Sequence, residues 1–148
     1  MAVRSVGVWF TVHPKSSKFD VCDISACQVY DSSASETSTD KAVDDTAKKV
    51  LVTKGTSVVA KAEYAAENNQ VDCDDGKTGT DTTEWPCTDD VVCKGETANG
   101  HGRGMCQRGS NRWAKGKKAD GTPAPGGAQK FDWILTHYYP KLEMVTGT

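Results

Sequence analysis

The stretch with the richest chemistry runs from Gly100 to Ser110, GHGRGMCQRGS, where glycines alternate with an imidazole, a thiol, an amide and two guanidinium groups. Glycine tolerates positive φ and lets a ligand approach the backbone closely, but it costs conformational order. The following residues read as helix, and a helix N-terminus presents free N–H groups to whatever lies above it. A tight turn packed on a sheet is the alternative. Because His, Cys and Gln are interleaved, we interpret the stretch as a cleft wall.

Cys106 offers two kinds of chemistry. It lies five residues after His101, and the pair could form a thiol–imidazole dyad in which the helix N-terminus favours the thiolate. The alternative is a disulfide, with Cys93 as a candidate partner, that would leave Cys106 inert. The chain has six cysteines, an even number, and this favours the disulfide. The same count, in a chain rich in Asp, Thr, Gly and Ser, indicates an oxidising compartment.

Composition excludes several functional classes. The net charge of −2 offers no polycationic face for nucleic acid or anionic lipid, so we expect neither partner. No apolar run reaches the length of a spanning helix, and we expect no membrane insertion. The apolar segment from Val6 to Val12 is too short and interrupted for a secretory signal peptide.

The elements that must position the Gly-rich stretch alternate between helix and strand. Phe131, Ile134, Leu135 and Tyr138 recur at helical spacing and predict a helix with a buried stripe. Lys54-Gly55 separates two β-rich segments and predicts a hairpin. Residues 67–99 lack periodicity and hold three cysteines, which favours a stapled loop. The predicted helices cover 2–12, 40–46 (capped by Ser38 or Thr39), 104–116 and 131–138, and the predicted strands cover 49–53, 57–64 and 142–145.

These elements predict an α+β fold, a small antiparallel sheet flanked by helices. We expect a disulfide-stapled single domain over residues 1–148, large enough to bury about 70% of its unfolded surface. Cys22 and Cys27 are close enough in sequence to form a local bridge.

The sequence resembles the stage II sporulation protein D family, which includes peptidoglycan lytic transglycosylases and amidase-enhancer (LytB-like) relatives. GHGRGMCQRGS resembles the family signature GHGxGMSQxGA, and FDWILTHYYP resembles its YxxILxHYYP helix. Residues 41–64 resemble its hairpin region, and residues 2–5 resemble the end of its arginine-bearing helix. The motifs follow the family order over almost the whole chain.

The resemblance implies cleavage of the bond between N-acetylmuramic acid and N-acetylglucosamine, with a 1,6-anhydro product. One carboxylic acid of raised pKa suffices, because the sugar's own hydroxyl attacks in place of water. The family's acid is a Glu upstream of the arginine-bearing helix, and no residue here aligns with it. We therefore expect an N-terminally truncated family domain that has lost its native activity, with Glu67 and Glu63 as weak candidates for a substitute acid.

The resemblance also implies a ligand groove. Arg4, His101, Gly102, Cys106, Gln107 and Arg108 would bind the glycan strands of peptidoglycan. Some family members hold zinc with one His and two Cys after the arginine-bearing helix, which here would be His13, Cys22 and Cys27. We favour the Cys22–Cys27 disulfide over this metal site and expect no other cofactor. The parent protein would be extracellular or in the cell envelope.

Departures from the family pattern keep other functions open. Val6 stands where the family usually has Tyr, and Arg108 stands where an aromatic residue is common, so sugar stacking is weakened. One alternative is an engineered or repurposed thermostable scaffold whose cleft binds or converts an unnatural small molecule. Another is a purely structural module of a surface layer or spore coat.

Overall fold

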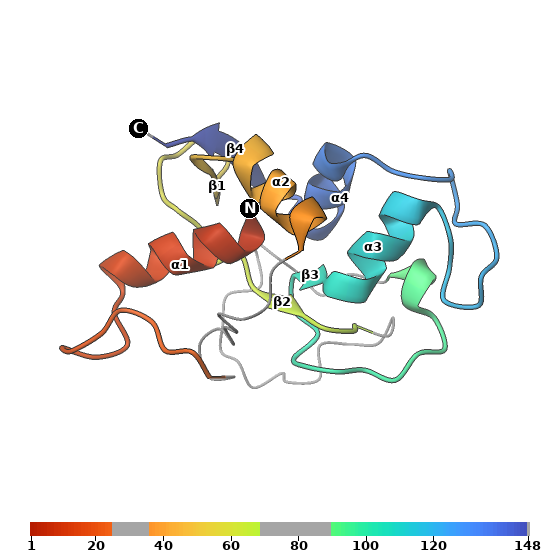
Figure 1. Ribbon diagram of the computed structural model, residues 1–148, viewed down its shortest axis with the longest axis horizontal. Coiled ribbons are helices and arrows are strands. Elements are labelled where there is room, and N and C mark those ends of the chain that lie inside the picture. Colours follow the sequence, from red (N-terminus) through yellow and green to blue (C-terminus); the bar gives the residue numbers. More distant parts are fainter. Residues whose placement is uncertain (25–35, 69–89, 148) are drawn as a thin grey trace.

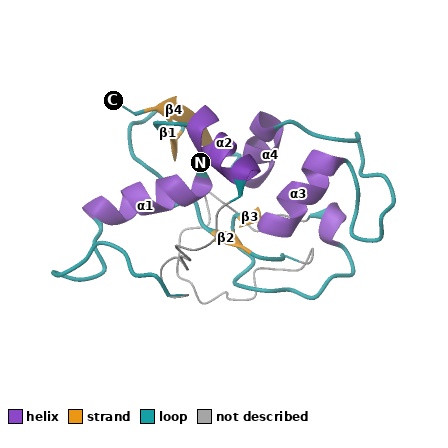
Figure 2. Cartoon of the chain, in the orientation of Figure 1, coloured by secondary structure: helices purple, strands orange, loops and turns teal. Residues whose placement is uncertain are grey.

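The computed structural model describes residues 1–24, 36–68 and 90–147, and these form an α+β arrangement (Figures 1 and 2). The predicted fold class is confirmed. The described elements are α1 (Ala2–Val12), α2 (Thr37–Asp45), β1 (Lys49–Thr53), β2 (Tyr64–Ala65), the 3₁₀ helix η2 (Val91–Cys93), β3 (Met105–Cys106), α3 (Gln107–Lys115), α4 (Phe131–Tyr138) and β4 (Leu142–Thr146).

Two small sheets link parts of the chain that are far apart in sequence. β1 pairs antiparallel with the terminal strand β4, from Lys49 opposite Thr146 to Thr53 opposite Leu142. β2 pairs parallel with β3, with Ala65 opposite Cys106. The predicted hairpin after β1 is reduced to one isolated bridge, between Val52 and Val59. The second segment of that hairpin instead ends in β2, which pairs with β3 in the Gly-rich stretch.

Helix α1 lies on β1 through its buried face, which comprises Ala2, Ser5, Val6 and Phe10. Ser5 is completely buried, and its hydroxyl accepts a 2.8 Å hydrogen bond from the backbone N–H of Leu51. A buried serine needs such a partner, because an unpaired hydroxyl in the core is destabilising. The bond therefore fixes the position of α1 along the strand.

The main core lies between α3, α4 and the strands, and it is centred on Trp113, Tyr138 and Tyr139. The predicted buried stripe of the last helix is partly wrong. Ile134 and Tyr138 are buried, but Phe131 is 54% exposed. Phe131 is the first residue of α4, and the helix turns Trp133 instead toward Trp113, with ring centroids 4.9 Å apart.

Helix boundaries differ from the prediction at two places. Helix α2 begins at Thr37, and its N-cap residue Glu36 makes no side-chain capping bond, so neither Ser38 nor Thr39 is the cap. Helix α3 begins only at Gln107, because Gly104 has a φ of 64° and Cys106 is an extended N-cap residue. The two residues before the helix, Met105 and Cys106, therefore form β3.

Of the three described cysteines, Cys22 is disulfide-bonded and the other two are free. Cys93 and Cys106 are free thiols whose Sγ atoms lie 3.4 Å apart, whereas a disulfide needs about 2.05 Å. The expected Cys93–Cys106 bridge is therefore wrong. The other three cysteines, Cys27, Cys73 and Cys87, lie outside the described residues, so Cys27 as the partner of Cys22 stays a prediction. Within the described parts of the chain, none of the helices has the length and apolar character needed to span a bilayer.

Candidate functional site

The Gly-rich stretch turns sharply and then enters α3. Gly100, Gly102 and Gly104 all have positive φ, from 64° to 102°. A Cβ atom at Gly104 would collide with the backbone carbonyl of Glu63, so only glycine fits there. This close approach allows β3 to pair with β2 and places Cys106 inside the molecule.

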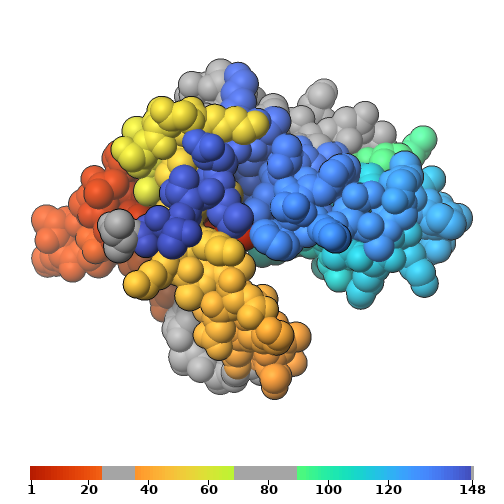
Figure 3. Space-filling view, turned by 90° about the horizontal axis from the view of Figure 1, so that it is seen from above, coloured from red at the N-terminus to blue at the C-terminus, as the bar shows by residue number. Residues whose placement is uncertain are grey.

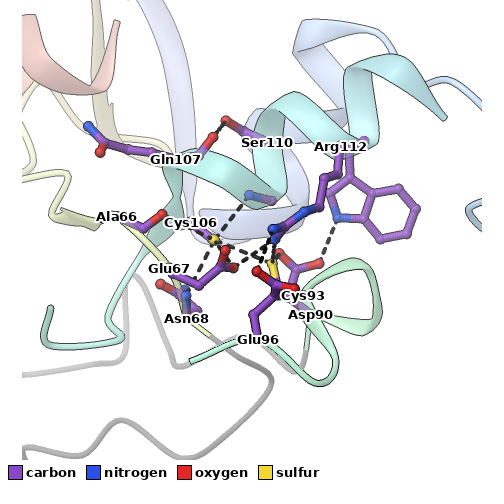
Figure 4. A network of polar contacts seen from close by, with 12 residues as sticks. Ala66, Glu67, Asn68, Asp90, Cys93, Glu96, Cys106, Gln107, Ser110 and Arg112 are labelled. Atoms are coloured by element: carbon purple, nitrogen blue, oxygen red, sulfur yellow. Dashed lines mark hydrogen bonds and ion pairs between the residues drawn. The ribbon is translucent and has the colours of Figure 1, made fainter. Parts of the chain in front are cut away.

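Cys106 is the N-cap residue of α3, and a sulfur atom takes the place of the usual hydroxyl or carboxylate oxygen. Its Sγ accepts hydrogen bonds from the backbone N–H groups of Gly109, at 3.1 Å, and Asn68, at 3.3 Å. The thiol of Cys93, at the end of η2, lies 3.4 Å away. Figure 4 shows these groups converging beneath the first turn of α3.

Glu67 completes this cluster from the strand side. It is completely buried, and its Oε1 lies 3.3 Å from Cys106 Sγ. Arg112, one turn into α3, donates to Glu67 Oε1 at 2.8 Å and lies 3.3 Å from Cys93 Sγ. Its other terminal nitrogen pairs with Glu96 at 3.2 Å. We call Glu67, Cys93, Cys106 and Arg112 the thiol cluster.

The two thiols have opposite protonation tendencies. The hydrogen bond from Cys93 lowers the pKa of Cys106, as do the backbone N–H groups of Asn68 and Gly109, and together these effects outweigh burial. The pKa of Cys93 is raised, first by its bond to Cys106 and then by burial and Glu67. For Glu67, burial raises the pKa, but bonds from Arg112 and the two thiols outweigh it and lower the net value. The cluster therefore holds two sulfur groups and one carboxylate next to one guanidinium group, and Cys106 ionises more readily than Cys93.

Asp90 anchors the cluster to the core. It is completely buried, and it accepts hydrogen bonds from Trp113 Nε1 at 2.8 Å, from the hydroxyl of Tyr138 and from Cys93 Sγ at 3.3 Å. Burial raises its pKa, but the His137 imidazole, with Nε2 3.7 Å from Asp90 Oδ1, and the hydrogen bonds from Tyr138, Trp113 and Cys93 lower the net value. Asp90 is therefore held as an anion that orients the thiol of Cys93.

The second carboxylate considered as a substitute acid, Glu63, has a comparable environment. It is 7% exposed and pairs with Arg103 and, at 2.9 Å, with Lys61. Burial raises the pKa of Glu63, but these two partners outweigh it and the net pKa is lowered. A general acid needs a raised pKa. Neither Glu63 nor Glu67 is tuned for that role.

The structure places the other predicted site residues in several locations. Arg4 is half-buried and donates to the backbone carbonyls of Val43, at 3.2 Å, of Lys49, at 3.1 Å, and of Thr46. It therefore ties α1 to the junction between α2 and β1. His101 Nδ1 accepts a 3.0 Å bond from the backbone N–H of Arg103, and it shapes the Gly-rich turn.

His101 and Cys106 do not form the dyad geometry considered above. Cys106 is completely buried, and thiol, carboxylate and backbone amide groups surround its Sγ. Gly102 lies in the turn, with a φ of 74°. Gln107 and Arg108 are exposed at the start of α3. In Figure 4 the side chain of Gln107 points away from the thiol cluster.

A groove of about 610 Å³ lies on the other side of α3. One wall comes from the start of α1 and from α2 with the start of β1, and the other comes from α3 and α4. Figure 3 shows α2 projecting from the body of the molecule beside the segments of α3 and α4. The groove is lined by Met1, Ala2, Val3, Ala42, Asp45, Thr46, Lys49, Met105, Ser110, Asn111, Ala114, Phe131, Ile134 and Leu135.

Gln107 precedes Ser110 and Asn111 by three and four residues, so all three share one face of α3. This face links the Gly-rich stretch with the groove. Arg4, His101 and Cys106 do not line it. Arg4 nevertheless holds in place the α2–β1 junction that supplies the lining residues Asp45, Thr46 and Lys49.

The zinc ligands suggested by the family resemblance are His13, Cys22 and Cys27, and Cys27 lies outside the described residues. His13 is exposed, its Nδ1 lies 3.0 Å from the carbonyl of Trp9, and its ring stacks on Trp9. The sequence alone did not indicate Asp90, Asn68 or Arg112 as site residues. Their spacing along the chain carries no signal, because the cluster that they surround forms only when β2 pairs with β3. That pairing brings Glu67 next to Cys106, which is 39 residues away in sequence.

Comparison with known proteins gives one match. Residues 1–53, which contain α1, α2 and β1, match the family model of the stage II sporulation protein (SpoIID). The match covers the first 53 of the 148 residues and confirms the resemblance for that segment, whereas the resemblance of the Gly-rich stretch and of α4 stays a prediction. Comparisons with curated proteins and with solved structures gave no match. The family match supports a peptidoglycan-related sporulation domain.

Proposed function

We propose that this chain binds glycan strands of peptidoglycan in the groove between α2 and the α3–α4 pair. The observation that carries the proposal is the composition of the groove walls. The wall formed by α1, α2 and β1 lies within the residues that match the sporulation family. The Gly-rich stretch leads directly into the opposite wall through α3.

The chemistry of the groove suits an amino sugar. Met105, Ile134 and Leu135 supply apolar surface for sugar C–H groups and for acetyl methyl groups. Lys49, Ser110 and Asn111 supply hydrogen-bonding groups, and Phe131, which is 54% exposed, offers a ring for stacking. An apolar lining with a few polar groups is typical of ligand sites in proteins.

We propose further that turnover of the glycan is weak or absent. The lowered pKa values of Glu63 and Glu67 keep both carboxyl groups ionised near neutral pH, so neither has a proton for the leaving oxygen. In a parent protein of the cell envelope, the proton for the leaving oxygen would then come from an acidic group outside residues 1–148.

Binding can be tested with peptide-stripped glycan strands and two matched variants. Ala114 and Lys115 are neighbouring exposed residues in the last turn of α3, but only Ala114 lines the groove. A tryptophan at position 114 would fill the groove. We therefore expect Ala114→Trp to weaken binding on the order of tenfold or more, and Lys115→Trp to retain it. Equal affinities in the two variants, or no binding by the unmodified chain, would refute the groove as the glycan site.

The same samples test turnover. Mass spectrometry after prolonged incubation should show no new 1,6-anhydro ends. Appearance of these ends, with their loss in Glu63→Gln or Glu67→Gln, would identify a working acid and overturn the proposed lack of turnover.

A second candidate function follows from the apolar character of the groove. Its lining is mainly aliphatic, and such a lining also suits a small apolar molecule. A repurposed scaffold would bind such a ligand tightly and show no glycan affinity. Competition between an apolar dye and glycan strands, measured with the Ala114→Trp variant as the control, distinguishes the two ligands.

A further inference from the structure

We propose that Glu67, Cys93 and Cys106 bind a thiophilic divalent cation, with Zn²⁺ as the best fit. One ligand atom from each residue lies within 4.8 Å of the other two. All three side chains are completely buried. This site differs from the set His13, Cys22 and Cys27, with which it shares no residue, and it lies apart from the groove.

The donor geometry is close to that of a tetrahedral metal site. With Zn–S bonds of about 2.3 Å, two thiolates on a tetrahedral ion lie about 3.8 Å apart. The Sγ atoms of Cys93 and Cys106 lie 3.4 Å apart, and Cys106 Sγ lies 3.3 Å from Glu67 Oε1. An outward shift of a few tenths of an ångström in these two separations would admit the ion, and the third pair of donor atoms lies within 4.8 Å. Thiolate ligands select zinc over magnesium or calcium, which prefer oxygen.

The surroundings of Cys106 stabilise a thiolate. Two backbone N–H groups, from Asn68 and Gly109, point at its Sγ, and the N-terminus of α3 adds its positive end. Arg112 Nη1 lies 3.3 Å from Cys93 Sγ and could donate to that sulfur once it is ionised. Such donors around the ligands orient them and increase metal affinity.

Charge also favours a cation. Two thiolates and the carboxylate of Glu67 carry three negative charges, and Arg112 supplies one positive charge. A divalent cation would bring the four groups to neutrality. Without the ion, Cys93 keeps its proton, which faces both Asp90 Oδ2 at 3.3 Å and Cys106 Sγ at 3.4 Å. Metal binding would release this proton to solvent, while Asp90 retains its bonds from Trp113 and Tyr138.

Two buried oxygen atoms beside the thiols also indicate a bound species. Glu67 Oε2 and Asn68 Oδ1 are inaccessible to solvent and have no hydrogen-bond partner among the described residues. Unpartnered buried oxygens are destabilising, and a carboxylate oxygen especially so. A cation bound by Glu67, with a water in its fourth position, would supply a partner for both.

The test uses Co²⁺ as a spectroscopic probe in the full chain under a non-thiol reductant. To leave only the proposed thiolates, Cys22, Cys27, Cys73 and Cys87 are all replaced by Ser. We expect one equivalent of Co²⁺ per chain, with the visible bands of tetrahedral cobalt and a thiolate charge-transfer band, and displacement by Zn²⁺. Cys93→Ser or Cys106→Ser should abolish both signals.

A matched pair of variants keeps the test decisive if the Ser variants unfold. Glu67 and Glu96 both pair with Arg112, but only Glu67 belongs to the proposed donor set. We expect Glu67→Gln to weaken Zn²⁺ binding on the order of tenfold or more and Glu96→Gln to leave it within about twofold. Equal affinity in these two variants would refute the role of Glu67.

Two further outcomes would overturn the metal site. One is that the reduced, folded chain takes up no cobalt. This result counts against the site even where peptide mapping shows that a disulfide joined Cys93 and Cys106 before reduction. The other is tetrahedral cobalt binding that persists in the Cys93→Ser, Cys106→Ser double variant.

Discussion

Arg103 and Glu63 form an ion pair whose two side chains are only 8% and 7% exposed. The pair joins the Gly-rich turn to the residue before β2. Removing one member of a buried pair leaves the other charge uncompensated, which costs more than the pair itself contributes. The neighbouring ammonium group of Lys61, 2.9 Å from Glu63, offsets part of that cost.

We expect Arg103→Met to lower the free energy of unfolding by about 3 kcal/mol, because Glu63 would remain buried with Lys61 as its one charged partner among the described residues. Urea denaturation followed by circular dichroism measures the change. The double variant Arg103→Met, Glu63→Gln removes the stranded charge and should recover part of the loss. A double variant less stable than the single one would contradict this account.

Acid should destabilise the protein through the buried carboxylates. The pKa values of Glu63, Glu67 and Asp90 are all lowered in the folded state. Their stabilising contribution is therefore complete above their unfolded values of about 4 and is lost as pH falls through the lowered folded values. We expect the melting temperature to be nearly constant from pH 7 to about pH 5 and to fall steeply below about pH 4. The Glu63→Gln, Glu67→Gln variant should show a shallower fall in melting temperature with acid, and an equally steep fall would contradict this assignment.

The sequence predicts the elements of this fold better than their pairing. Periodicity and breakers are local signals, and they locate α1, β1, α4 and β4 to within a few residues. The exposed position of Phe131 could not be predicted, because helical spacing defines a stripe and does not say which of its members reaches the core. Trp133, outside the stripe, packs on Trp113 instead.

The thiol cluster could not be predicted for a different reason. Its members come from β2, η2 and α3, and their meeting depends on the parallel pairing of β2 with β3. That pairing depends in turn on Gly104, whose lack of a Cβ atom lets the Gly-rich turn lie against Glu63. The even number of cysteines favoured a bridge between Cys93 and Cys106. The prediction brought together the right two side chains but assigned them the wrong chemistry.

Gly109 should tolerate no side chain. A Cβ atom there would lie 2.8 Å from Cys93 Sγ and 2.5 Å from the hydroxyl of Tyr138. We expect Gly109→Ala to lower the free energy of unfolding by about 2 kcal/mol, because the first turn of α3 would have to move away from the thiol cluster. Thermal unfolding measures the loss.

Gly7 provides the control for this change. It lies within α1, and a Cβ atom there would meet nothing within 4 Å. Alanine is the better helix former, so Gly7→Ala should raise the free energy of unfolding by about 0.5–1 kcal/mol. Opposite signs for the two substitutions are expected. Destabilisation of similar size in both would show that close packing at Gly109 is not the cause.

Arg4 should support folding without contacting the glycan, and Arg108 provides the control at an exposed position. Arg4 donates to carbonyls of Val43, Thr46 and Lys49, so Arg4→Met should lower the free energy of unfolding by about 2 kcal/mol. Well below the melting temperature its glycan affinity should remain unchanged, because the side chain supports the groove wall and does not line it. Arg108 is exposed at the start of α3 and does not line the groove either, so Arg108→Met should change stability by less than about 0.5 kcal/mol and leave glycan affinity unchanged. Unfolding curves and glycan titrations on the same samples measure both effects. An Arg4→Met variant with full stability and weakened binding would show that Arg4 contacts the ligand directly.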